Sequence, residues 1–454
     1  MGKSFDFDYI IIGSGPAGAT AALELAKNKR KKIALVEGKN YGGSNLNTRD
    51  IPYAVSLNFV HTFHNLKNLP EASRQNFHYN FPTIVAHQNS VINSIKFGDK
   101  KFYRNSGITC IDGFANFLDA NTIAVGNKKF TANYFILATG AELNTADIIG
   151  LESVDYFTPN TIIKIRRLPK YALIVGGGST GCEIAEYLAK LGTKVILMES
   201  NARILPKEEP EASELLREYF EKELDVRVME KCRVVEIAKD KNAKRVIFAT
   251  DNREKMVRVD CVVLATGSNP RTDYGLENAN VRFNESGIIV DRLFQTSNRN
   301  IFAIGDCISN DSSTERAEYE AVTLVNNLLH KAKTSASYLG FPRITATWPE
   351  IATIGETEAE LKRNKIKYRK SVVYLKDTTV SQIYRENYGF VKLLVDSKNR
   401  LVGATIMAPQ ASLMIAELSF AIRRHATISE IASTPHISNN LNNLIKIAAD
   451  QFKK

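Results

Sequence analysis

Two stretches of the chain repeat one pattern of apolar and polar positions. In each, a short apolar run leads into a glycine-rich turn, then into a stretch with helical spacing of apolar residues, then into a second apolar run that ends at an acid. The first stretch is DYIIIGSGPAGATAALELAKNKRKKIALVEG (8–38) and the second is YALIVGGGSTGCEIAEYLAKLGTKVILMES (171–200). The order strand, helix, strand predicts two βαβ units with parallel strands.

Glycines and one acid occupy matching places in the two stretches. They are Gly13, Gly15, Gly18 and Glu37 in the first, and Gly176, Gly178, Gly181 and Glu199 in the second. In a dinucleotide-binding turn, the first glycine makes the bend, the second lets N–H groups approach a diphosphate, and the third packs helix on strand. A carboxylate about 20 residues later accepts hydrogen bonds from a ribose. Two complete copies predict two dinucleotide sites.

Three further apolar runs end in turns. They are FILATGAE (135–142), CVVLATGSNPR (261–271) and TSNRNIFAIGDC (296–307). Ligands of α/β proteins bind at the carboxyl ends of parallel strands, so Thr139, Gly140 and Asp306 are predicted to lie near a bound cofactor. An ordinary turn aspartate is the alternative for Asp306.

The last third of the chain has a different pattern. Segments 344–361 and 388–409 indicate strands with turns, and segments 414–433 and 439–452 have the spacing of amphipathic helices. No glycine-rich phosphate turn occurs here. The pattern favours an α+β domain whose apolar face forms an interface.

Length and composition indicate a multidomain globular protein. The chain has 454 residues, of which 44% are hydrophobic and 24% charged, and this length favours two to four domains. No apolar run approaches the roughly 20 residues of a membrane span. The N-terminus lacks the pattern of a signal peptide, so a cytoplasmic location is expected.

Charge and cysteine content exclude several classes of site. The net charge is +11, and part of it lies in the run 27–32. This run has no interleaved aromatic residues, so a solvated loop is favoured over a nucleic-acid surface. The five cysteines form no close pair, which fits a reducing compartment, and they predict no metal site.

Taken together, these motifs resemble the flavoprotein pyridine nucleotide–disulfide oxidoreductases, from about residue 8 to the C-terminus. The resemblance implies an α/β fold with two Rossmann-like dinucleotide-binding domains, for FAD and NAD(P), and a C-terminal α+β dimerisation domain. The expected segments are 1–145 and 271–337 for FAD, 146–270 for NAD(P) and 338–454 for dimerisation. A homodimer is therefore expected.

The resemblance also implies the site residues. FAD would be bound by Gly13, Gly15, Gly18, Glu37, Gly43, Ser44, Ala115, Thr139, Gly140, Asp306 and Thr314. The nicotinamide dinucleotide would be bound by Gly176, Gly178, Gly181, Glu199 and Gly267. Glu183 matches an acid near the flavin and the nicotinamide, which makes it a candidate catalytic residue.

Glu199 bears on the choice of nicotinamide cofactor. A carboxylate suits the free 2′-hydroxyl of NADH and would repel the 2′-phosphate of NADPH. Arg203, four residues further on, could compensate that repulsion. NADH is therefore favoured, and NADPH is the alternative.

The loop YGGSNLNTRDIPY (41–53) departs from the family. Asn45 and Asp50 stand where the disulfide reductases have their two redox cysteines, and Ala54 replaces a lysine. Near the C-terminus, the family's His–Glu acid–base pair is missing. His436 lies two positions after the expected place, so a surface or packing histidine is favoured over a relocated base.

The chain is therefore interpreted as an FAD-dependent NAD(P)H oxidoreductase that passes hydride from nicotinamide to flavin and then directly to a small acceptor. Quinone, oxygen or another nicotinamide would serve. Asp50 is expected to lower the flavin potential by its charge, with a proton relay or a polar filler as alternatives. Two other functions stay open: a flavin-binding structural or regulatory homologue, and a dihydrolipoamide dehydrogenase-like dithiol enzyme.

Overall fold

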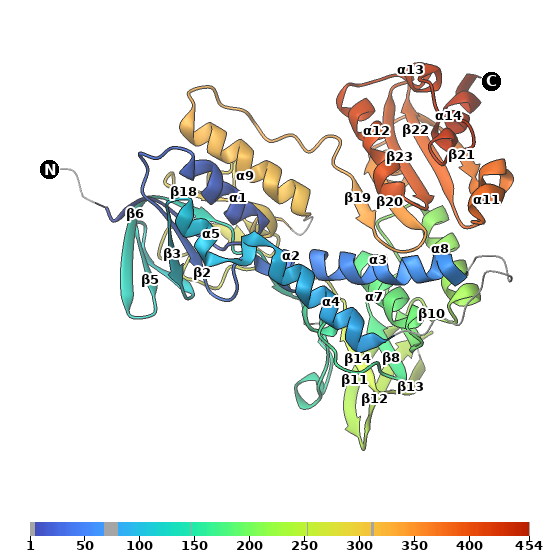
Figure 1. The fold of residues 1–454 in the computed structure, drawn as a ribbon, viewed down its shortest axis with the longest axis horizontal. Coiled ribbons are helices and arrows are strands. Elements are labelled where there is room, and N and C mark those ends of the chain that lie inside the picture. Colours follow the sequence, from blue (N-terminus) through green and yellow to red (C-terminus); the bar gives the residue numbers. More distant parts are fainter. Residues whose placement is uncertain (1–4, 68–79, 146, 252, 310–312, 454) are drawn as a thin grey trace. The chain divides into compact units, whose positions relative to one another are not determined.

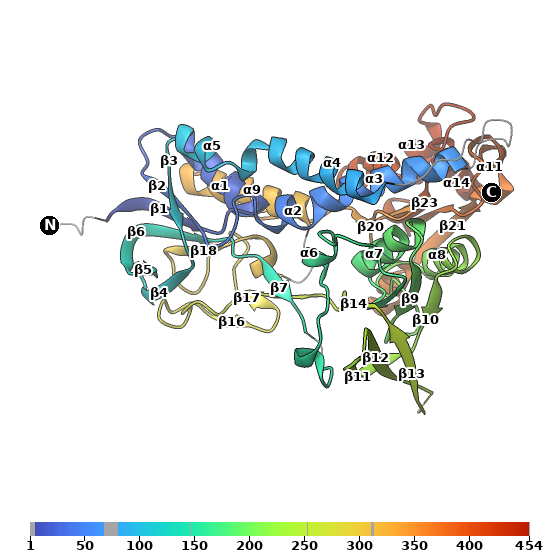
Figure 2. The same cartoon turned by 60° about the horizontal axis from the view of Figure 1, so that its bottom comes forward.

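The chain divides into two compact units in a computed structural model that describes residues 5–67, 80–145, 147–251, 253–309 and 313–453 (Figures 1 and 2). The first unit comprises 1–55, 85–144 and 267–338, and the second comprises 56–84, 145–266 and 339–454. Both units have mixed α/β structure. Among the described residues, every helix is too short or too polar to cross a bilayer.

A seven-stranded sheet forms the centre of the first unit. The strand order is β3-β2-β1-β6-β5-β4, and β18 also pairs with β6. β1, β2, β3, β6 and β18 run parallel, as the first βαβ pattern predicts, and β4 and β5 add an antiparallel end. The bounds are β1 Phe7–Ile12, β2 Ile33–Glu37, β3 Ile108–Asp112, β4 Ala115–Asp119, β5 Thr122–Val125, β6 Lys128–Leu137 and β18 Ile301–Ala303.

This sheet is covered by apolar clusters on both faces. Ile11 of β1 belongs to one cluster, and Ile10 and Ile12 belong to the other, because successive strand side chains point to opposite faces. Helices α1 (Pro16–Ala26) and α9 (Thr314–Leu329) contribute to the cluster of Ile11 and lie side by side. The consecutive apolar residues of β1 are thus explained by burial on two sides.

Smaller elements complete the first unit. Helices α2 (Gly43–Asn47) and α5 (Lys100–Asn105) follow β2 and precede β3, respectively. Helix α3 (Asp50–Lys67) begins in the first unit and continues into the second, and helix α4 (Phe81–Ser94) begins in the second and continues into the first. Two short strand pairs join β7 (Ala141–Leu143) to β15 (Ser268–Pro270), and β16 (Phe283–Asn284) to β17 (Gly287–Ile288).

Three sheets lie among the described residues of the second unit. A parallel sheet has the order β10-β9-β8-β14, an antiparallel sheet has the order β11-β12-β13, and a mainly C-terminal antiparallel sheet has the order β19-β20-β23-β22-β21. The bounds are β8 Tyr171–Val175, β9 Lys194–Met198, β10 Arg227–Met229, β11 Arg233–Asp240, β12 Ala243–Thr250, β13 Arg253–Val259, β14 Cys261–Leu264, β19 Arg343–Thr345, β20 Glu350–Gly355, β21 Tyr368–Tyr374, β22 Phe390–Asp396 and β23 Leu401–Ala408.

Helices pack against the parallel sheet and against the C-terminal antiparallel sheet. The described helices in this part of the chain are α6 Pro159–Ile162, α7 Ser179–Lys190, α8 Pro210–Glu223, α10 Glu358–Arg363, α11 Thr379–Tyr384, α12 Ala411–Arg423, α13 Ile428–Ser433 and α14 Asn443–Asp450. The helical segment predicted over 414–433 is two helices. Thr427 and Glu430 form a reciprocal capping box at the start of α13, which separates it from α12.

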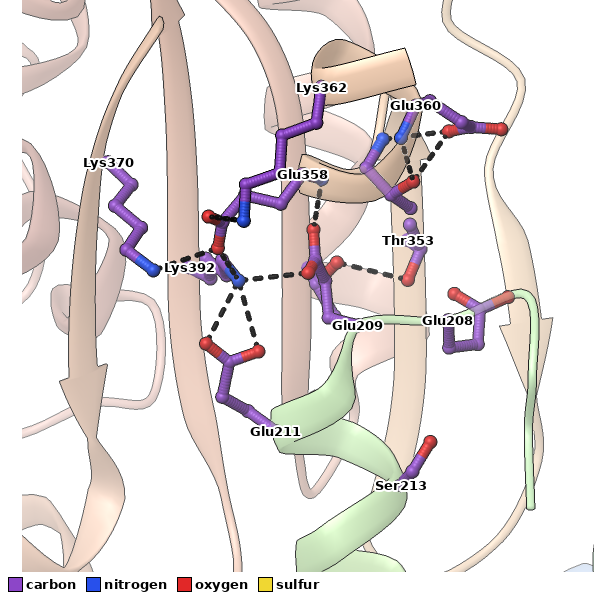
Figure 3. Close-up of polar contacts among 12 residues, drawn as sticks. Glu208, Glu209, Glu211, Ser213, Thr353, Glu358, Glu360, Lys362, Lys370 and Lys392 are labelled. Atoms are coloured by element: carbon purple, nitrogen blue, oxygen red, sulfur yellow. Dashed lines mark hydrogen bonds and ion pairs between the residues drawn. The ribbon is translucent and has the colours of Figure 1, made fainter. Parts of the chain in front are cut away.

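A buried lysine joins the C-terminal sheet to α8 within the second unit (Figure 3). Lys392 of β22 is 1% exposed, and its Nζ lies 2.9 Å from Glu209 Oε2, 2.9 Å from Glu211 Oε1 and 2.6 Å from Glu358 Oε2. The three carboxylates lie at the N-termini of α8 and α10, where the helix dipoles also favour negative charge.

The pKa values follow from this geometry. Burial by itself would lower the pKa of Lys392, but its hydrogen bonds with Glu209, Glu358 and Glu211 outweigh burial and raise it. Burial would raise the pKa of Glu358, but hydrogen bonds from Lys392, Tyr368 and Lys370 hold it well below its ordinary value. Lys392 and Glu358 are therefore both charged at neutral pH.

Replacing Lys392 by methionine is expected to destabilise the second unit by about 3–5 kcal/mol, because buried carboxylates lose their shared cation. Urea denaturation followed by circular dichroism would measure the change. Lys370→Met is the matched control: its side chain is 48% exposed and its Nζ lies 2.9 Å from Glu358 Oε2, so a loss below about 1 kcal/mol is expected. Equal losses for the two variants would contradict the cluster's importance.

Acid should weaken the same cluster. A carboxyl whose pKa is lowered by folding stabilises the native state above its unfolded value, here 4.5, and this contribution is lost as the pH falls further. The melting temperature is therefore expected to fall as the pH drops below 4.5. Glu358→Gln should make that fall less steep, and an identical pH dependence in this variant would count against the assignment.

Candidate functional site

The first glycine turn brings several predicted FAD residues together. The carbonyl oxygen of Gly13 lies 1.9 Å from the position that a Cβ on Gly18 would take, so only glycine fits there. Gly13 has φ +102° and lies against Ala138 and Thr139, in the turn after β6. Gly15 caps α1 and faces open space on its side-chain side. The turn can therefore admit a diphosphate at the N-terminus of α1.

The surrounding predicted residues meet the same turn. The Cβ position of Gly43 is 2.7 Å from the Cα atom of Gly15, and that of Gly305 is 3.1 Å from the Cβ atom of Ala17. Ser44 follows Gly43 and Asp306 follows Gly305 in the chain, so both residues lie near the N-terminus of α1. Gly140 faces open space, and its carbonyl oxygen accepts a hydrogen bond from Arg271 N at 3.0 Å.

Glu37 lies at the end of β2, beside the turn. Its Oε2 accepts hydrogen bonds from Ser14 N at 3.0 Å and Ser14 Oγ at 2.6 Å. The carbonyl oxygen of Glu37 accepts a hydrogen bond from Gly113 N, two residues before Ala115, the first residue of β4. The carboxylate and Ala115 therefore flank one end of the turn, which fits an adenosine.

The two residues at the redox-cysteine positions form a hydrogen-bonded triangle with Thr314. Asn45 Nδ2 donates to Asp50 Oδ2 at 2.7 Å and contacts Thr314 Oγ1 at 2.7 Å, and Thr314 Oγ1 donates to Asp50 Oδ2 at 2.7 Å. Thr314 is the first residue of α9, and Asp50 is the first residue of α3. An amide, a carboxylate and a hydroxyl thus occupy the place expected for a dithiol.

The second glycine turn has the geometry of the first. The Cβ position of Gly181 is 1.9 Å from the carbonyl oxygen of Gly176, and that of Gly176 is 2.4 Å from the carbonyl oxygen of Ala265. Gly178 caps α7 and faces open space. Gly267, the other residue predicted for this site, belongs to the first unit.

Glu199 is buried beside the second turn. Its Oε2 accepts Gly177 N at 2.7 Å, and its Oε1 accepts Asn201 N and Asn201 Nδ2, each at 2.7 Å. Arg203 donates through Nη2 to the carbonyl oxygens of Glu208 at 2.6 Å and Pro206 at 3.3 Å. The Arg203 guanidinium is therefore hydrogen-bonded within its own loop. The Glu199 carboxylate, in contrast, is hydrogen-bonded to the glycine-rich turn.

Glu183 lies on α7 and contacts the C-terminal part of the same unit. Its Oε1 accepts Ala346 N at 2.8 Å and Ser179 Oγ at 3.4 Å. Glu183 belongs to the second unit and Asp50 to the first. A backbone N–H thus occupies one oxygen of this predicted catalytic carboxylate.

The five cysteines are all free thiols. Burial raises the pKa of Cys307 to about 12 and that of Cys261 to about 11, and it raises the pKa of Cys182 well above its ordinary value. Burial also raises the pKa of Cys110. Thiols held in the protonated form are poor nucleophiles and poor redox centres.

Several charged contacts were not identified from the sequence. His436, expected to be a surface or packing residue, has a buried side chain whose Nε2 lies 3.1 Å from Glu417 Oε1. Glu186 and Lys190 of α7 form a buried ion pair of 2.6 Å. Their spacing of four residues was the only sequence signal for this pair.

The chain belongs to the pyridine nucleotide-disulphide oxidoreductases. The model of this family matches residues 7–331, and the model of the family's dimerisation domain matches residues 341–449. The enzymes of this family use FAD and a nicotinamide dinucleotide, so the predicted family, fold class, enzyme class and cofactors are confirmed. The dimerisation domain indicates a homodimer.

Individual relatives match over almost the whole chain. The mercuric reductase of Bacillus cereus is 27% identical over 459 residues, which cover 99% of this chain and 72% of that protein. The dihydrolipoyl dehydrogenase of Bacillus subtilis is 28% identical over 456 residues, which cover 98% and 96%.

Two solved structures have the same fold. The HOCl-induced flavoprotein disulfide reductase RclA of Escherichia coli has a TM-score of 0.86 at 23% identity, with 98% of this chain and 99% of that chain covered. LpdA of Mycobacterium tuberculosis has the same TM-score, identity and coverage.

Gly178→Ala is expected to fold normally, because a Cβ there meets no atom within 4 Å. Its methyl group would face the predicted diphosphate, so the Kd for NADH should rise at least about tenfold, or about 1.4 kcal/mol. Fluorescence titration with NADH would measure it. Gly15→Ala is the matched control: it should weaken FAD retention and leave NADH affinity unchanged. Unchanged NADH affinity in Gly178→Ala would rule out this binding position.

Proposed function

We propose that the chain is an FAD-dependent NAD(P)H oxidoreductase in which electrons leave the flavin directly for a small acceptor, without a redox disulfide. The observation that carries this proposal is the Asn45–Asp50–Thr314 triangle at the expected dithiol position. Neither an amide nor a carboxylate can form a disulfide or a thiolate. Burial raises the pKa of Cys307 and Cys182, which makes these thiols poor redox centres and supports the same conclusion.

The two proposed cofactor-binding regions each contain one of the two glycine-rich turns. Residues 1–145 and 271–337 would hold FAD, 146–270 would hold the nicotinamide dinucleotide, and 338–454 would form the dimer. Bound FAD would accept a hydride from the nicotinamide and reduce the acceptor. The open N-termini of α1 and α7 would bind the two diphosphates, and Glu37 and Glu199 would bind riboses.

NADH is the preferred reductant in this proposal. The carboxylate of Glu199 would accept hydrogen bonds from a ribose diol and would repel a 2′-phosphate. Arg203, which could have offset that repulsion, donates to the carbonyl oxygens of Glu208 and Pro206. Comparison of kcat/KM for NADH and NADPH would test the preference.

Asp50 is the residue most directly linked to the electron-transfer step. The carboxylate of Asp50 accepts two hydrogen bonds at Oδ2, from Asn45 Nδ2 and from Thr314 Oγ1, both at 2.7 Å. We propose that this negative charge disfavours an anionic reduced flavin and lowers the flavin potential. Proton transfer by Asp50 to a reduced quinone is the second role that a carboxylate at this position could serve.

The first test is anaerobic mixing of the purified protein with NADH. The flavin absorbance should bleach, and it should recover when a quinone, oxygen or an oxidised nicotinamide analogue is added. Lipoamide and glutathione disulfide should restore no absorbance. Absence of bleaching would favour a structural or regulatory flavoprotein, and rapid reoxidation by lipoamide would establish a dithiol enzyme.

The second test is the flavin midpoint potential of Asp50→Asn. The amide oxygen can still accept hydrogen bonds from Asn45 and Thr314, so the change removes charge with little change in shape. The potential is expected to rise, by about 30 mV for each 1.4 kcal/mol of repulsion removed. Asp119→Asn, at an exposed hairpin of the first unit, should leave it unchanged. A potential that stayed constant in Asp50→Asn would contradict the role.

A further inference from the structure

One face of α7 carries a stripe of polar side chains that contacts a single extended segment of the second unit. The stripe consists of Ser179, Glu183, Glu186 and Lys190, spaced by three or four residues so that they share one face. The segment is 344–348, which runs from β19 toward β20. Both belong to the second unit.

The contacts follow the same order along α7 and along segment 344–348. Ser179 Oγ lies 2.8 Å from Thr345 Oγ1, and Ala346 N donates to Glu183 Oε1 at 2.8 Å. Trp348 N then donates to both carboxylate oxygens of Glu186 at 3.0 Å. Alternate N–H groups of an extended segment point the same way, so Ala346 and Trp348 meet carboxylates on successive turns of α7.

Glu186 is the most buried member of the stripe, with no exposed surface. Its Oε1 lies 2.6 Å from Lys190 Nζ, and its Oε2 lies 3.5 Å from His61 Nε2 of α3. The ring of His61 also contacts the indole of Trp348, with centroids 5.5 Å apart. Burial would raise the pKa of Glu186, but Lys190 and His61 outweigh burial and lower it.

The other groups around Trp348 are also fixed. Its Nε1 donates to Glu386 Oε2 at 2.9 Å. Lys190 Nζ lies 6.0 Å from the Trp348 ring and 5.9 Å from that of Tyr219. A buried ion pair alone contributes little net stability compared with apolar residues of the same size. The carboxylate of Glu186 does what an apolar residue could not do, because it binds the backbone of Trp348.

We propose that Glu186 is a positioning residue for hydride transfer: by accepting the Trp348 N–H it sets the register of segment 344–348 on α7. That register places Ala346 N on Glu183 and fixes the helix whose N-terminus faces the dinucleotide. The role assigned to Glu183 rests on the proposed function. The geometry of the register rests on the contacts of Glu186 alone.

Two double variants separate the hydrogen bond from the ion pair. Glu186→Gln with Lys190→Met is neutral and keeps an oxygen for Trp348 N, whereas Glu186→Met with Lys190→Met is neutral and has none. Both keep the side-chain volume. Glu218→Gln with Lys222→Met is the matched control, because it removes an exposed pair of the same spacing on α8.

The limiting rate of flavin bleaching by NADH, expressed per bound flavin, is the kinetic measurement. The Glu186→Met double variant should lose at least about tenfold in this rate, since a misplacement near 1 Å can cost about a hundredfold. Its Kd for NADH should stay within about threefold of the wild type. The Glu186→Gln double variant and the control should keep the wild-type rate. A purely structural role would lower the yield of flavoprotein and leave the rate per flavin unchanged.

Tryptophan emission supplies a measurement that needs no turnover. Trp348 is the chain's single tryptophan, so its emission reports this register directly. The Glu186→Met double variant should shift the emission maximum, and the Glu186→Gln variant should not. Equal rates and equal emission in the two variants would overturn the proposal. Failure of wild-type bleaching would instead reject the proposed function, and the emission comparison would still test the register.

Discussion

Both nucleotide turns depend on one close approach of backbone to backbone. In each turn, the carbonyl oxygen of the first glycine lies only 1.9 Å from the position that a Cβ atom on the third glycine would take. This contact presses the helix onto its strand and aims the helix N-terminus at the end of the sheet. Ser14 and Glu37 in the first unit, and Gly177 and Glu199 in the second, are then joined by equivalent hydrogen bonds. One local constraint thus brings together the turn predicted to bind a diphosphate and the carboxylate predicted to bind a ribose.

The chemistry beside the first turn is set by side chains that this constraint does not involve. Asn45, Asp50 and Thr314 bind one another at the place where the family has its dithiol. The loop keeps its position through Gly43, which packs on Gly15. Under the proposed function, this arrangement would keep both predicted dinucleotide sites while replacing the thiols that relay electrons in the family. An acceptor that reacts directly with a flavin would then be favoured.

Buried charges connect the nucleotide-binding and C-terminal parts of the second unit. The Lys392 ammonium group contacts three carboxylates at the N-termini of α8 and α10. The carboxylates of Glu183 and Glu186 on α7 accept hydrogen bonds from backbone N–H groups of segment 344–348. Removing a charge from water is costly unless it gains hydrogen bonds and an opposite charge. Lys392 and Glu186 have both kinds of partner, and Glu183 accepts hydrogen bonds. The contacts are directional, so they fix how α7 and α8 lie against the C-terminal sheet of this unit.

The sequence by itself determined the two βαβ units, the family and the replacement of the dithiol, because glycine spacing, apolar runs and side-chain identity are local properties. It predicted one helix over 414–433, which the structure divides into α12 and α13 at the capping box of Thr427 and Glu430. Only the tertiary structure decided that Asn45 and Asp50 bond to Thr314 and that Arg203 donates within its own loop. It also decided that Glu186 and Lys392 are buried beside opposite charges and that His436 lies against Glu417. Partners such as Lys392 and Glu209 lie far apart in the chain, and a charged residue has the same letter whether it is solvated or paired.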